Sequence, residues 1–384
     1  MLKGKPACAS PYGRSKRRIR SLPGTHRALA CKTRERRMRA GQTHPKAPLP
    51  LSLNSPYLAA MQTHLDPADR AGLQQYLQQQ NYLAKGEPLA HVEKPGEGNM
   101  NLVLRVCTPM RSFILKQARP YVEKYPDIPA PTERSTVEAA YLEATAGNMG
   151  IAGKHPRLLH QDTDNHVLML QDLGNGQDYT RLYRQGSQWR KAQTAELLGY
   201  LSLLHRLTPT DFPTNDAMRA LNHEHLFVFP LRNDTGFNLD SVQPGLQDLA
   251  QPLRQNEELR AKFDELGKLY RSKGTHLLHG DFYPGSWLAT EQGLKVIDPE
   301  FAFCGPVEFD LGVFLAHLYL SRHEKHALDA IRSYYANDYN QDLLLQFAGV
   351  EIIRRLIGLA QLPVDLDLQE KAELLKTAEI MVLR

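Results

Sequence analysis

The order of apolar and polar residues changes character near residue 173. Before that point, short apolar runs bounded by glycine and proline are typical of β-strands. The runs that predict strands are "NLVLRV" (101–106), "SFILKQ" (112–117) and "NHVLMLQDLG" (165–174). Two helices accompany them: one over residues 66–83, for which Asp66 is the predicted N-cap, and one over 133–150, which ends at glycine.

After residue 175, apolar residues recur at helical spacing. "QTAELLGYLSLLHRL" (193–207) predicts a strongly amphipathic helix, and two short β segments, "HLLHGDF" and "LKVIDPEF", interrupt the later helices. The later helices are predicted at 244–273, 307–321, 324–338, 340–361 and 368–382. The pattern indicates an α+β fold with two lobes, a small antiparallel β-rich N-lobe (61–173) and a larger, mainly helical C-lobe (174–384). We expect a cleft between them.

The composition narrows the class of protein. Apolar residues make up 42% of the 384 positions, enough for a sizeable core. No apolar run approaches the ~20 residues that a membrane helix needs, and the N-terminus lacks the apolar core of a secretory signal. The four cysteines are scattered without CxxC spacing, which argues against a zinc site or a disulfide framework. These features predict a cytoplasmic protein.

The net charge of +5 is unevenly distributed. Residues 1–46 contain 14 Lys and Arg and a single acid, a net charge of +13, which leaves −8 for the rest of the chain. We interpret residues 1–60 as a basic, disordered extension and linker. Three interpretations remain open. The segment is a tail attracted to nucleic acid or membranes, or an Arg-rich targeting peptide, or an extension that has no folded role because translation starts later, at Met38 or Met61. We favour the last interpretation. We therefore expect no membrane partner, and we expect nucleic acid to be bound only through this extension, if at all.

Two acidic motifs carry the predicted chemistry. Asp281 in "HGDFYPGS" lies 17 residues before Asp298 in "VIDPEF", and Glu300 follows two residues later. In protein kinases an aspartate accepts the hydroxyl proton, a residue five positions later holds a metal, and a second aspartate links metal to the ATP phosphates. The matching positions are Asp281, Ser286 and Asp298, which with Glu300 offer the hard oxygen ligands that Mg²⁺ prefers. The alternative is that each acid merely ends a β-turn.

A Gly-rich turn before the first strand predicts a phosphate site. In "KPGEGNMN" (94–101), backbone N–H groups can form a cradle for phosphate oxygens. The candidate nucleotide-binding residues of this turn are Gly96, Gly98, Asn99 and Asn101. Gly-rich hairpin turns are also common without a ligand, so the turn is informative only together with the acidic motifs.

Three further positions complete the predicted nucleotide site. Lys116 lies in the strand after the Gly-rich turn, where a kinase lysine pairs with phosphates. Glu138 lies on the next helix and is the predicted partner of Lys116. The segment "LMLQDL" (168–173) resembles the hinge whose backbone holds adenine, which makes Gln171 and Leu173 candidate contacts.

Arg354 and Arg355 stand inside an otherwise apolar helical segment, "AGVEIIRRLIGLA". They predict either a salt bridge to a carboxylate or a guanidinium that faces the transferring phosphoryl group, whose oxygens suit planar bidentate donors. Because adjacent helical residues point ~100° apart, we expect only one of them to reach the site directly.

Three other features have simpler interpretations. Asp310 in "FDLG" is the predicted N-cap of the following helix and a candidate brace for the catalytic loop. His223 and His225 in "NHEHLF" lack a third ligand and the HExxH spacing of a zinc site. Trp287, Phe301 and Phe303 are predicted core residues.

Taken together, these motifs resemble the aminoglycoside-phosphotransferase and choline-kinase group, and within it the methylthioribose kinases. The resemblance runs from about residue 66 to the C-terminus through "GEGNMNLVLRV", "ILKQARPYV", "LNHEHLFVFPL", "HGDFYPGS", "IDPEFAFCGPVEFDLG" and "EIIRRLIGLA". It implies a protein-kinase-like fold, ATP and Mg²⁺, and γ-phosphate transfer to the C1 hydroxyl of 5-methylthioribose in methionine salvage. It also implies Asp281 as base, Asp298 and Glu300 as metal ligands, the arginine pair at the phosphoryl group, and a possible homodimer.

The loop departs from the family pattern, which is close to HGDLHTGS. Phe282, Tyr283 and Pro284 replace Leu-His-Thr, while Asp281 and Ser286 are retained. The departure affects the acceptor more than the reaction. The alternatives are therefore a relative acting on an aminoglycoside, choline, homoserine or another sugar, and a pseudokinase-like nucleotide-binding protein.

Overall fold

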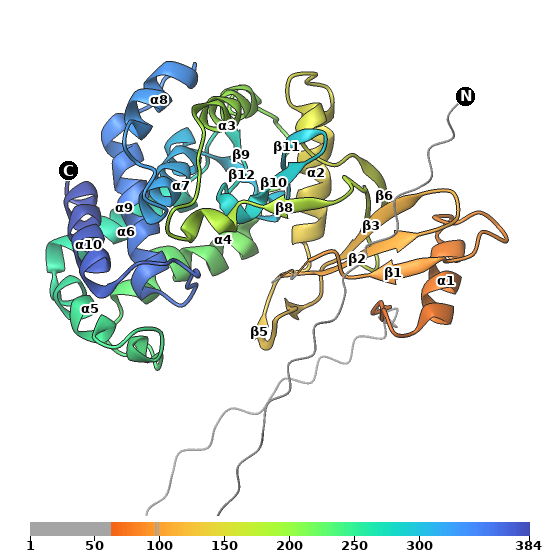
Figure 1. Ribbon diagram of the computed structural model, residues 1–384, viewed down its shortest axis with the longest axis horizontal. Helices are drawn as coiled ribbons and strands as arrows, with labels where there is room; N and C mark the ends of the chain where they lie inside the picture. Colours follow the sequence, from red (N-terminus) through yellow and green to blue (C-terminus); the bar gives the residue numbers. More distant parts are fainter. Residues whose placement is uncertain (1–62, 97, 99) are drawn as a thin grey trace, which may run out of the picture. The chain divides into compact units, whose positions relative to one another are not determined.

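The computed structural model describes residues 63–96, 98 and 100–384 (Figure 1). The basic extension predicted at 1–60 and the predicted phosphate-cradle residue Asn99 lie outside the described residues. The α+β class is confirmed: an antiparallel sheet comes first in the chain, and a mainly helical region follows. Within the described ranges, no helix is long and apolar enough to span a membrane.

The first part of the described chain is built on a five-stranded antiparallel sheet in the order β1–β2–β3–β7–β6. Its strands are β1 (His91–Glu93), β2 (Leu102–Cys107), β3 (Ser112–Gln117), β6 (Leu158–Asp162) and β7 (Val167–Gln171). A short hairpin, β4 (Tyr121–Val122) and β5 (Tyr125–Pro129), follows β3. The three strands predicted from apolar runs are thus confirmed, with the third two to three residues shorter at each end.

Side-chain alternation gives the sheet two different faces. Along β3, Phe113 and Leu115 point to the face covered by helix α1 (Arg70–Gln79), where they join one apolar cluster. Ile114 and Lys116 point to the opposite face, against which helix α2 (Arg134–Ala146) packs. Lys116 is therefore directed away from the α1 side and toward the rest of the molecule.

Helix α1 begins later than predicted. Asp69, and not Asp66, is its N-cap, and the Asp69 carboxylate accepts the Gly72 N–H. Asp66 instead closes a turn before the helix: its side chain accepts the Ala68 N–H and its carbonyl accepts the Asp69 N–H. The prediction was wrong because two aspartates on either side of Pro67 both satisfy the N-cap pattern.

The second part of the described chain contains the predicted helices, most of them with changed boundaries. They are α3 (Lys191–Leu204), α4 (Asp216–His223), α5 (Leu246–Gln255), α6 (Glu257–Arg271), α7 (Val307–Leu320), α8 (Ala327–Tyr334), α9 (Gln341–Ile357) and α10 (Leu368–Val382). The helix predicted at 244–273 is two helices, because Asn256 interrupts it and caps α6 through the Leu259 N–H. The sequence analysis missed α4. The strongly amphipathic character predicted for α3 is wrong, since residues 193–204 are all buried or half-buried and the outer face, which includes Glu196, is only partly exposed.

Two small sheets present the acidic motifs. One contains β8 (Gly176–Asp178), β10 (Trp287–Thr290) and β11 (Gly293–Val296), and the other pairs β9 (His276–Leu278) with β12 (Phe303–Gly305). Strand β9 leads into the His-Gly-Asp turn, and β11 leads into the Asp-Pro-Glu turn. Because β12 follows the Asp-Pro-Glu turn, its pairing with β9 brings that turn close to the His-Gly-Asp turn.

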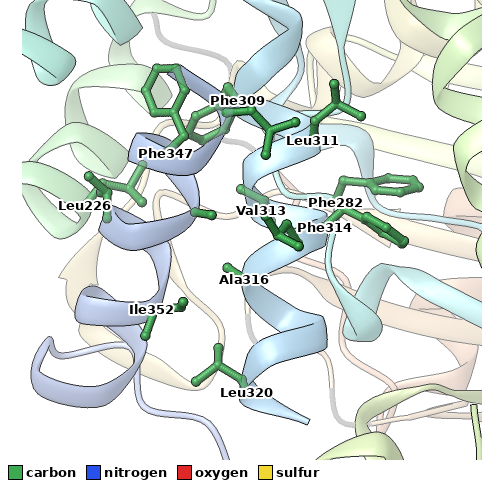
Figure 2. Packing of buried hydrophobic residues seen from close by; sticks show 14 of the residues in the cluster. Leu226, Phe282, Phe309, Leu311, Val313, Phe314, Ala316, Leu320, Phe347 and Ile352 are labelled. Atoms are coloured by element: carbon green, nitrogen blue, oxygen red, sulfur yellow. The ribbon is translucent and has the colours of Figure 1, made fainter. Parts of the chain in front are cut away.

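Helices α7 and α9 form the centre of the helical core, and Figure 2 shows side chains from both. The Phe309 and Phe347 rings meet edge to face with centroids 5.4 Å apart. The two helices approach closely at Gly312, where an added Cβ would lie 2.7 Å from the Phe347 Cβ. Phe282 of the predicted catalytic loop lies in the same core, with its ring 6.4 Å from Phe314.

Candidate functional site

A buried carboxylate braces the His-Gly-Asp turn. Asp310 is fully buried, and its oxygens accept the backbone N–H groups of His279 (2.7 Å) and Gly280 (3.0 Å). Its Oδ2 also lies 3.2 Å from His205 Nε2. Gly280 has φ +82°, and a Cβ there would meet the Phe301 carbonyl at 2.1 Å, so only glycine fits. The brace is confirmed, but Asp310 lies inside α7 and is not its N-cap, which is Pro306.

Asp281, at the end of that turn, faces both arginines of α9. Its Oδ1 lies 3.7 Å from Arg354 Nη2 and 3.6 Å from Arg355 Nη2. The expectation that only one arginine reaches the site is wrong, because the two long side chains converge on Glu351, one helical turn earlier. Burial raises the pKa of the Asp281 carboxyl to about 6, although Arg355 and Arg354 act to lower it.

Lys116 lies between two carboxylates. Its Nζ is 2.6 Å from Glu138 Oε2 and 2.7 Å from Asp298 Oδ1, which confirms the predicted Lys116–Glu138 pair. Burial lowers the pKa of Lys116, but the adjacent Asp298 and Glu138 carboxylates raise it well above its usual value, so the lysine is charged. Asp298 has a left-handed backbone (φ +61°), a conformation that concentrates at functional sites. Its side chain is about half exposed.

A cleft of about 270 Å³ adjoins this lysine. Six of the predicted nucleotide-binding residues and one predicted metal ligand line it: Gly96, Gly98, Lys116, Glu138, Gln171, Leu173 and Asp298. Its apolar walls are formed by Val103, Ile114, Leu170, Leu288 and Ile297. Gly285, four residues after Asp281, also lines the cleft, so the catalytic loop borders it.

Asn101 and Glu300 do not line the cleft, but their side chains are hydrogen-bonded to each other. Asn101 Nδ2 donates to Glu300 Oε2 (2.8 Å), and Arg134 Nε donates to Asn101 Oδ1 (2.8 Å). The fully buried Arg134 also forms an ion pair with Glu300 (3.2 Å) and donates to the Met100 carbonyl. The end of the Gly-rich turn is thereby tied to the Asp-Pro-Glu motif.

The remaining predicted metal ligand, Ser286, is buried within the catalytic loop, where its hydroxyl donates to the Asp281 carbonyl (2.9 Å). In the described part of the chain, no group of three or more His, Cys, Asp or Glu side chains is arranged to hold a metal ion. Metal binding by Asp298, Glu300 and Ser286 therefore stays a prediction.

The residues that depart from the family loop have separate environments. Phe282 is fully buried and stacks on Tyr200 at 5.9 Å with an interplanar angle of 3°. Tyr283 lies beneath the Arg355 guanidinium, whose Cζ is 5.0 Å from the ring centroid, and its ring is 5.4 Å from that of His317. Tyr283 is thus a neighbour of the arginine pair, while Phe282 belongs to the core.

Sequence reasoning missed four charged residues at the site. Glu351 holds both arginines, and Arg134 links two motifs. Arg105, on β2, pairs with Asp172 (3.0 Å) at the wall of the cleft. For Glu351 a signal was present: an acid at i−3 and i−4 from the arginines in an apolar helix is placed to contact both. Nothing in the sequence indicates the partners of Arg134.

Comparison with known proteins identifies a sequence family for this chain. Residues 91–344 match the sequence family described as "APH: Phosphotransferase enzyme family". The chain is 27% identical over 328 residues to a methylthioribose kinase of Exiguobacterium sibiricum, covering 72% of this chain and 82% of that one. It is 29% identical to a methylthioribose kinase of a Geobacillus species, covering 76% and 84%.

Among solved structures, a choline/ethanolamine kinase family protein from Mesorhizobium loti is 17% identical with a TM-score of 0.45. The match covers 77% of this chain and 92% of that one. The match to the sequence family extends over about two thirds of the chain and includes both acidic motifs. The chain therefore belongs to the phosphotransferase enzyme family and is a distant homologue of the methylthioribose kinases.

Proposed function

We propose that this protein is an ATP-dependent kinase that transfers the γ-phosphate to the C1 hydroxyl of 5-methylthioribose. The observation that carries the proposal is the position of Lys116, held between Glu138 and Asp298 at a cleft that the Asp281 loop also borders. This arrangement places a fixed cation for phosphates at the same cleft as the loop of Asp281, a half-buried carboxylate that can accept a proton. The distant homology to methylthioribose kinases supports the acceptor.

ATP would occupy the cleft. Its apolar walls suit a purine ring, and the Gly-rich turn, with Gly96 and Gly98 at the cleft, would supply N–H groups to the phosphates. The Gln171 N–H already donates to the Arg157 carbonyl. We therefore assign the adenine contacts to the Gln171 carbonyl and the Leu173 backbone. Lys116 would contact the phosphates, in the position fixed by Glu138.

Asp298 and Glu300 would hold Mg²⁺. The half-exposed Asp298 side chain, with Glu300 two residues later in the chain, suits this ion, which keeps several waters and uses few protein ligands. The Ser286 hydroxyl donates its proton to the Asp281 carbonyl and would contribute only an oxygen lone pair. Bound Mg²⁺ would neutralise charge on the phosphates during transfer.

Asp281 would act as the general base. It would accept the proton of the acceptor hydroxyl as that oxygen bonds to the γ-phosphorus, while the bond to the β-phosphate oxygen breaks and ADP leaves. The Nη groups of Arg354 and Arg355 face the same carboxylate, so they would stabilise the charge on the transferring phosphoryl oxygens. Catalysis would rest mainly on positioning and charge neutralisation.

A coupled ADP-release assay tests this proposal with a panel of sugars and amino alcohols. We expect turnover with methylthioribose, and a loss of at least about 100-fold in kcat for Asp281→Asn, since a general base contributes 10²–10⁴-fold. A thermal shift measured with Mg-ATP serves as a control that the variant still folds and binds nucleotide. No turnover with any acceptor would contradict the assigned reaction.

A different acceptor is the second candidate, and the contact of Tyr283 with Arg355 favours testing it. This ring replaces the histidine of the family pattern beside the proposed base. Methylthioribose, an aminoglycoside, choline and homoserine should be compared by kcat/KM at equal concentration. A higher kcat/KM for one of the others would reassign the acceptor. Binding of Mg-ATP without any turnover would instead indicate a nucleotide-binding scaffold.

A further inference from the structure

A buried carboxylate controls the orientation of the arginine pair. Glu351 is 1% exposed, and it accepts hydrogen bonds from the Nε groups of both Arg354 and Arg355. Its Oε1 also accepts from Arg354 Nη2 at 3.0 Å. Each guanidinium therefore turns its Nε edge toward Glu351 and still has an Nη2 atom within 4 Å of Asp281.

Two further buried side chains extend this contact. His317 on α7 is fully buried, and its Nε2 lies 3.0 Å from Glu351 Oε1. The Tyr183 hydroxyl, also fully buried, lies 2.7 Å from His317 Nδ1. Burial lowers the pKa of His317 to about 4, so the ring is neutral near pH 7 and carries one N–H.

The neighbours fix which nitrogen of His317 carries the proton. The adjacent arginines hold the pKa of Glu351 well below its usual value, so its carboxylate is ionised and can only accept. His317 Nε2–H must then donate to Glu351, and Nδ1 must accept from the Tyr183 O–H. The hydrogen bonds run in one direction, from Tyr183 through His317 to Glu351.

We propose that Glu351, His317 and Tyr183 form a positioning relay that holds both guanidiniums at the phosphoryl site, an inference that rests on the proposed function. The distances support a role beyond filling the core. The arginine Nε groups bond to Glu351, whereas the contacts of their Nη2 atoms with Asp281 are 3.6–3.7 Å, longer than hydrogen bonds. Each guanidinium is thus anchored through Nε, and that of Arg354 also through Nη2, while the remaining N–H groups of the Nη atoms can bond oxygens of an arriving phosphoryl group.

Four variants and one control test the relay. Glu351→Gln should lower kcat on the order of 100-fold, the loss expected for a displaced catalytic group, while KM for ATP stays unchanged because the cleft residues are intact. His317→Leu, which removes one hydrogen bond, should lower kcat about tenfold. His317→Gln should recover activity, since its amide can donate from the Nε2 position. Tyr183→Phe should have a smaller effect than His317→Leu.

Glu370→Gln is the matched control, because it breaks another Glu–Arg pair, with Arg322, at α10. It should leave kcat unchanged. A thermal melt of each variant separates misfolding from mispositioning. If His317→Gln loses as much activity as His317→Leu, or if Glu351→Gln keeps wild-type kcat, the relay is wrong while the proposed function stands.

A second measurement does not depend on turnover. Inorganic phosphate is titrated by calorimetry into the protein saturated with ADP. Glu351→Gln and His317→Leu should weaken phosphate binding about tenfold or more, a loss of one or more charge-supported hydrogen bonds. Glu370→Gln should not. If wild type turns over no acceptor but phosphate binding follows this pattern, the proposed function fails and the relay holds. Equal phosphate affinity in all variants would overturn the relay.

Discussion

Removing the charge of Lys116 should destabilise the fold through the carboxylate left behind. Lys116 Nζ lies 2.6 Å from Glu138, and both side chains are no more than 5% exposed. At an effective dielectric constant of ~20, an ion pair at this distance gains about 6 kcal/mol of Coulomb energy. Desolvation of the two ions offsets much of this gain, so we expect Lys116→Met to cost about 3–5 kcal/mol of unfolding free energy, the usual loss when one partner of a buried pair is removed.

A double replacement separates the ion pair from the packing. Lys116→Met with Glu138→Leu removes both charges and keeps apolar volume, so its unfolding free energy should return to within about 1–2 kcal/mol of wild type. Asp298 does not add to the loss, because its side chain is about half exposed and can be hydrated. Urea unfolding should be followed by far-UV circular dichroism. Tryptophan fluorescence would not report on the five-stranded sheet directly, because both tryptophans come later in the chain than this sheet.

The pH dependence provides an internal control. Burial raises the pKa of Glu138 and Lys116 lowers it, so loss of the lysine raises that pKa further. A carboxyl whose folded pKa is raised destabilises the fold as pH rises above its unfolded value near 4.5, so the variant should be most destabilised at high pH and should recover toward pH 4.5. A loss below 1 kcal/mol at pH 8, or a double variant as unstable as the single, would refute the reasoning.

Three further predictions concern the loop and the buried histidines. Asp310→Asn replaces one accepting oxygen with an NH2 group that faces a backbone N–H donor, so it should cost about 3 kcal/mol of unfolding free energy in urea unfolding. The kcat in the ADP assay should fall in parallel. Because the pKa of Asp281 is raised to about 6, kcat/KM for the acceptor should fall about tenfold per unit below pH 6, and a flat profile would exclude it as base. Burial lowers the pKa of His155 and His317 to about 4, so between pH 6.5 and 4 the unfolded chain binds a proton that the folded protein does not, and each histidine lowers the unfolding free energy by about 3 kcal/mol over this range. His155→Gln should therefore flatten the plot of unfolding free energy against pH between 6.5 and 4; an unchanged slope would contradict the assignment.

The sequence alone predicts the bounds of elements in which the apolar pattern is continuous over the whole element. Strand β3 has the bounds predicted for it, and α10 agrees with the predicted 368–382. The short strands β8, β10 and β12 were not predicted, because three or four residues carry too little pattern and are defined by their pairing partners. The continuous helix predicted over 244–273 failed for a related reason: the apolar spacing continues through Asn256, and only the side-chain cap shows the break.

For the site, sequence spacing identified the motifs but not the contacts between them. The Lys116–Glu138 pair was predicted because Lys116 lies on a predicted strand and Glu138 on the next predicted helix. The partners of Arg134 come from positions 101 and 300, and no local pattern relates them. The helical-wheel argument for the arginine pair failed because it located the Cβ atoms, whereas long side chains held by Glu351 place the charged ends.

The charges around the site bear on how a nucleotide could bind. The ion pairs around Lys116, Arg134 and the arginine pair join four cations and five carboxylates: Lys116, Arg134, Arg354 and Arg355 against Asp281, Asp298, Glu138, Glu300 and Glu351. With all of them ionised, the formal sum is −1, and each cation is already paired with at least one carboxylate. Such a cluster cannot by itself neutralise the phosphates of ATP, whose own charges would be repelled by the uncompensated carboxylate. A divalent cation entering with the nucleotide would reverse this balance, which is why we expect ATP to bind tightly only as its Mg²⁺ complex.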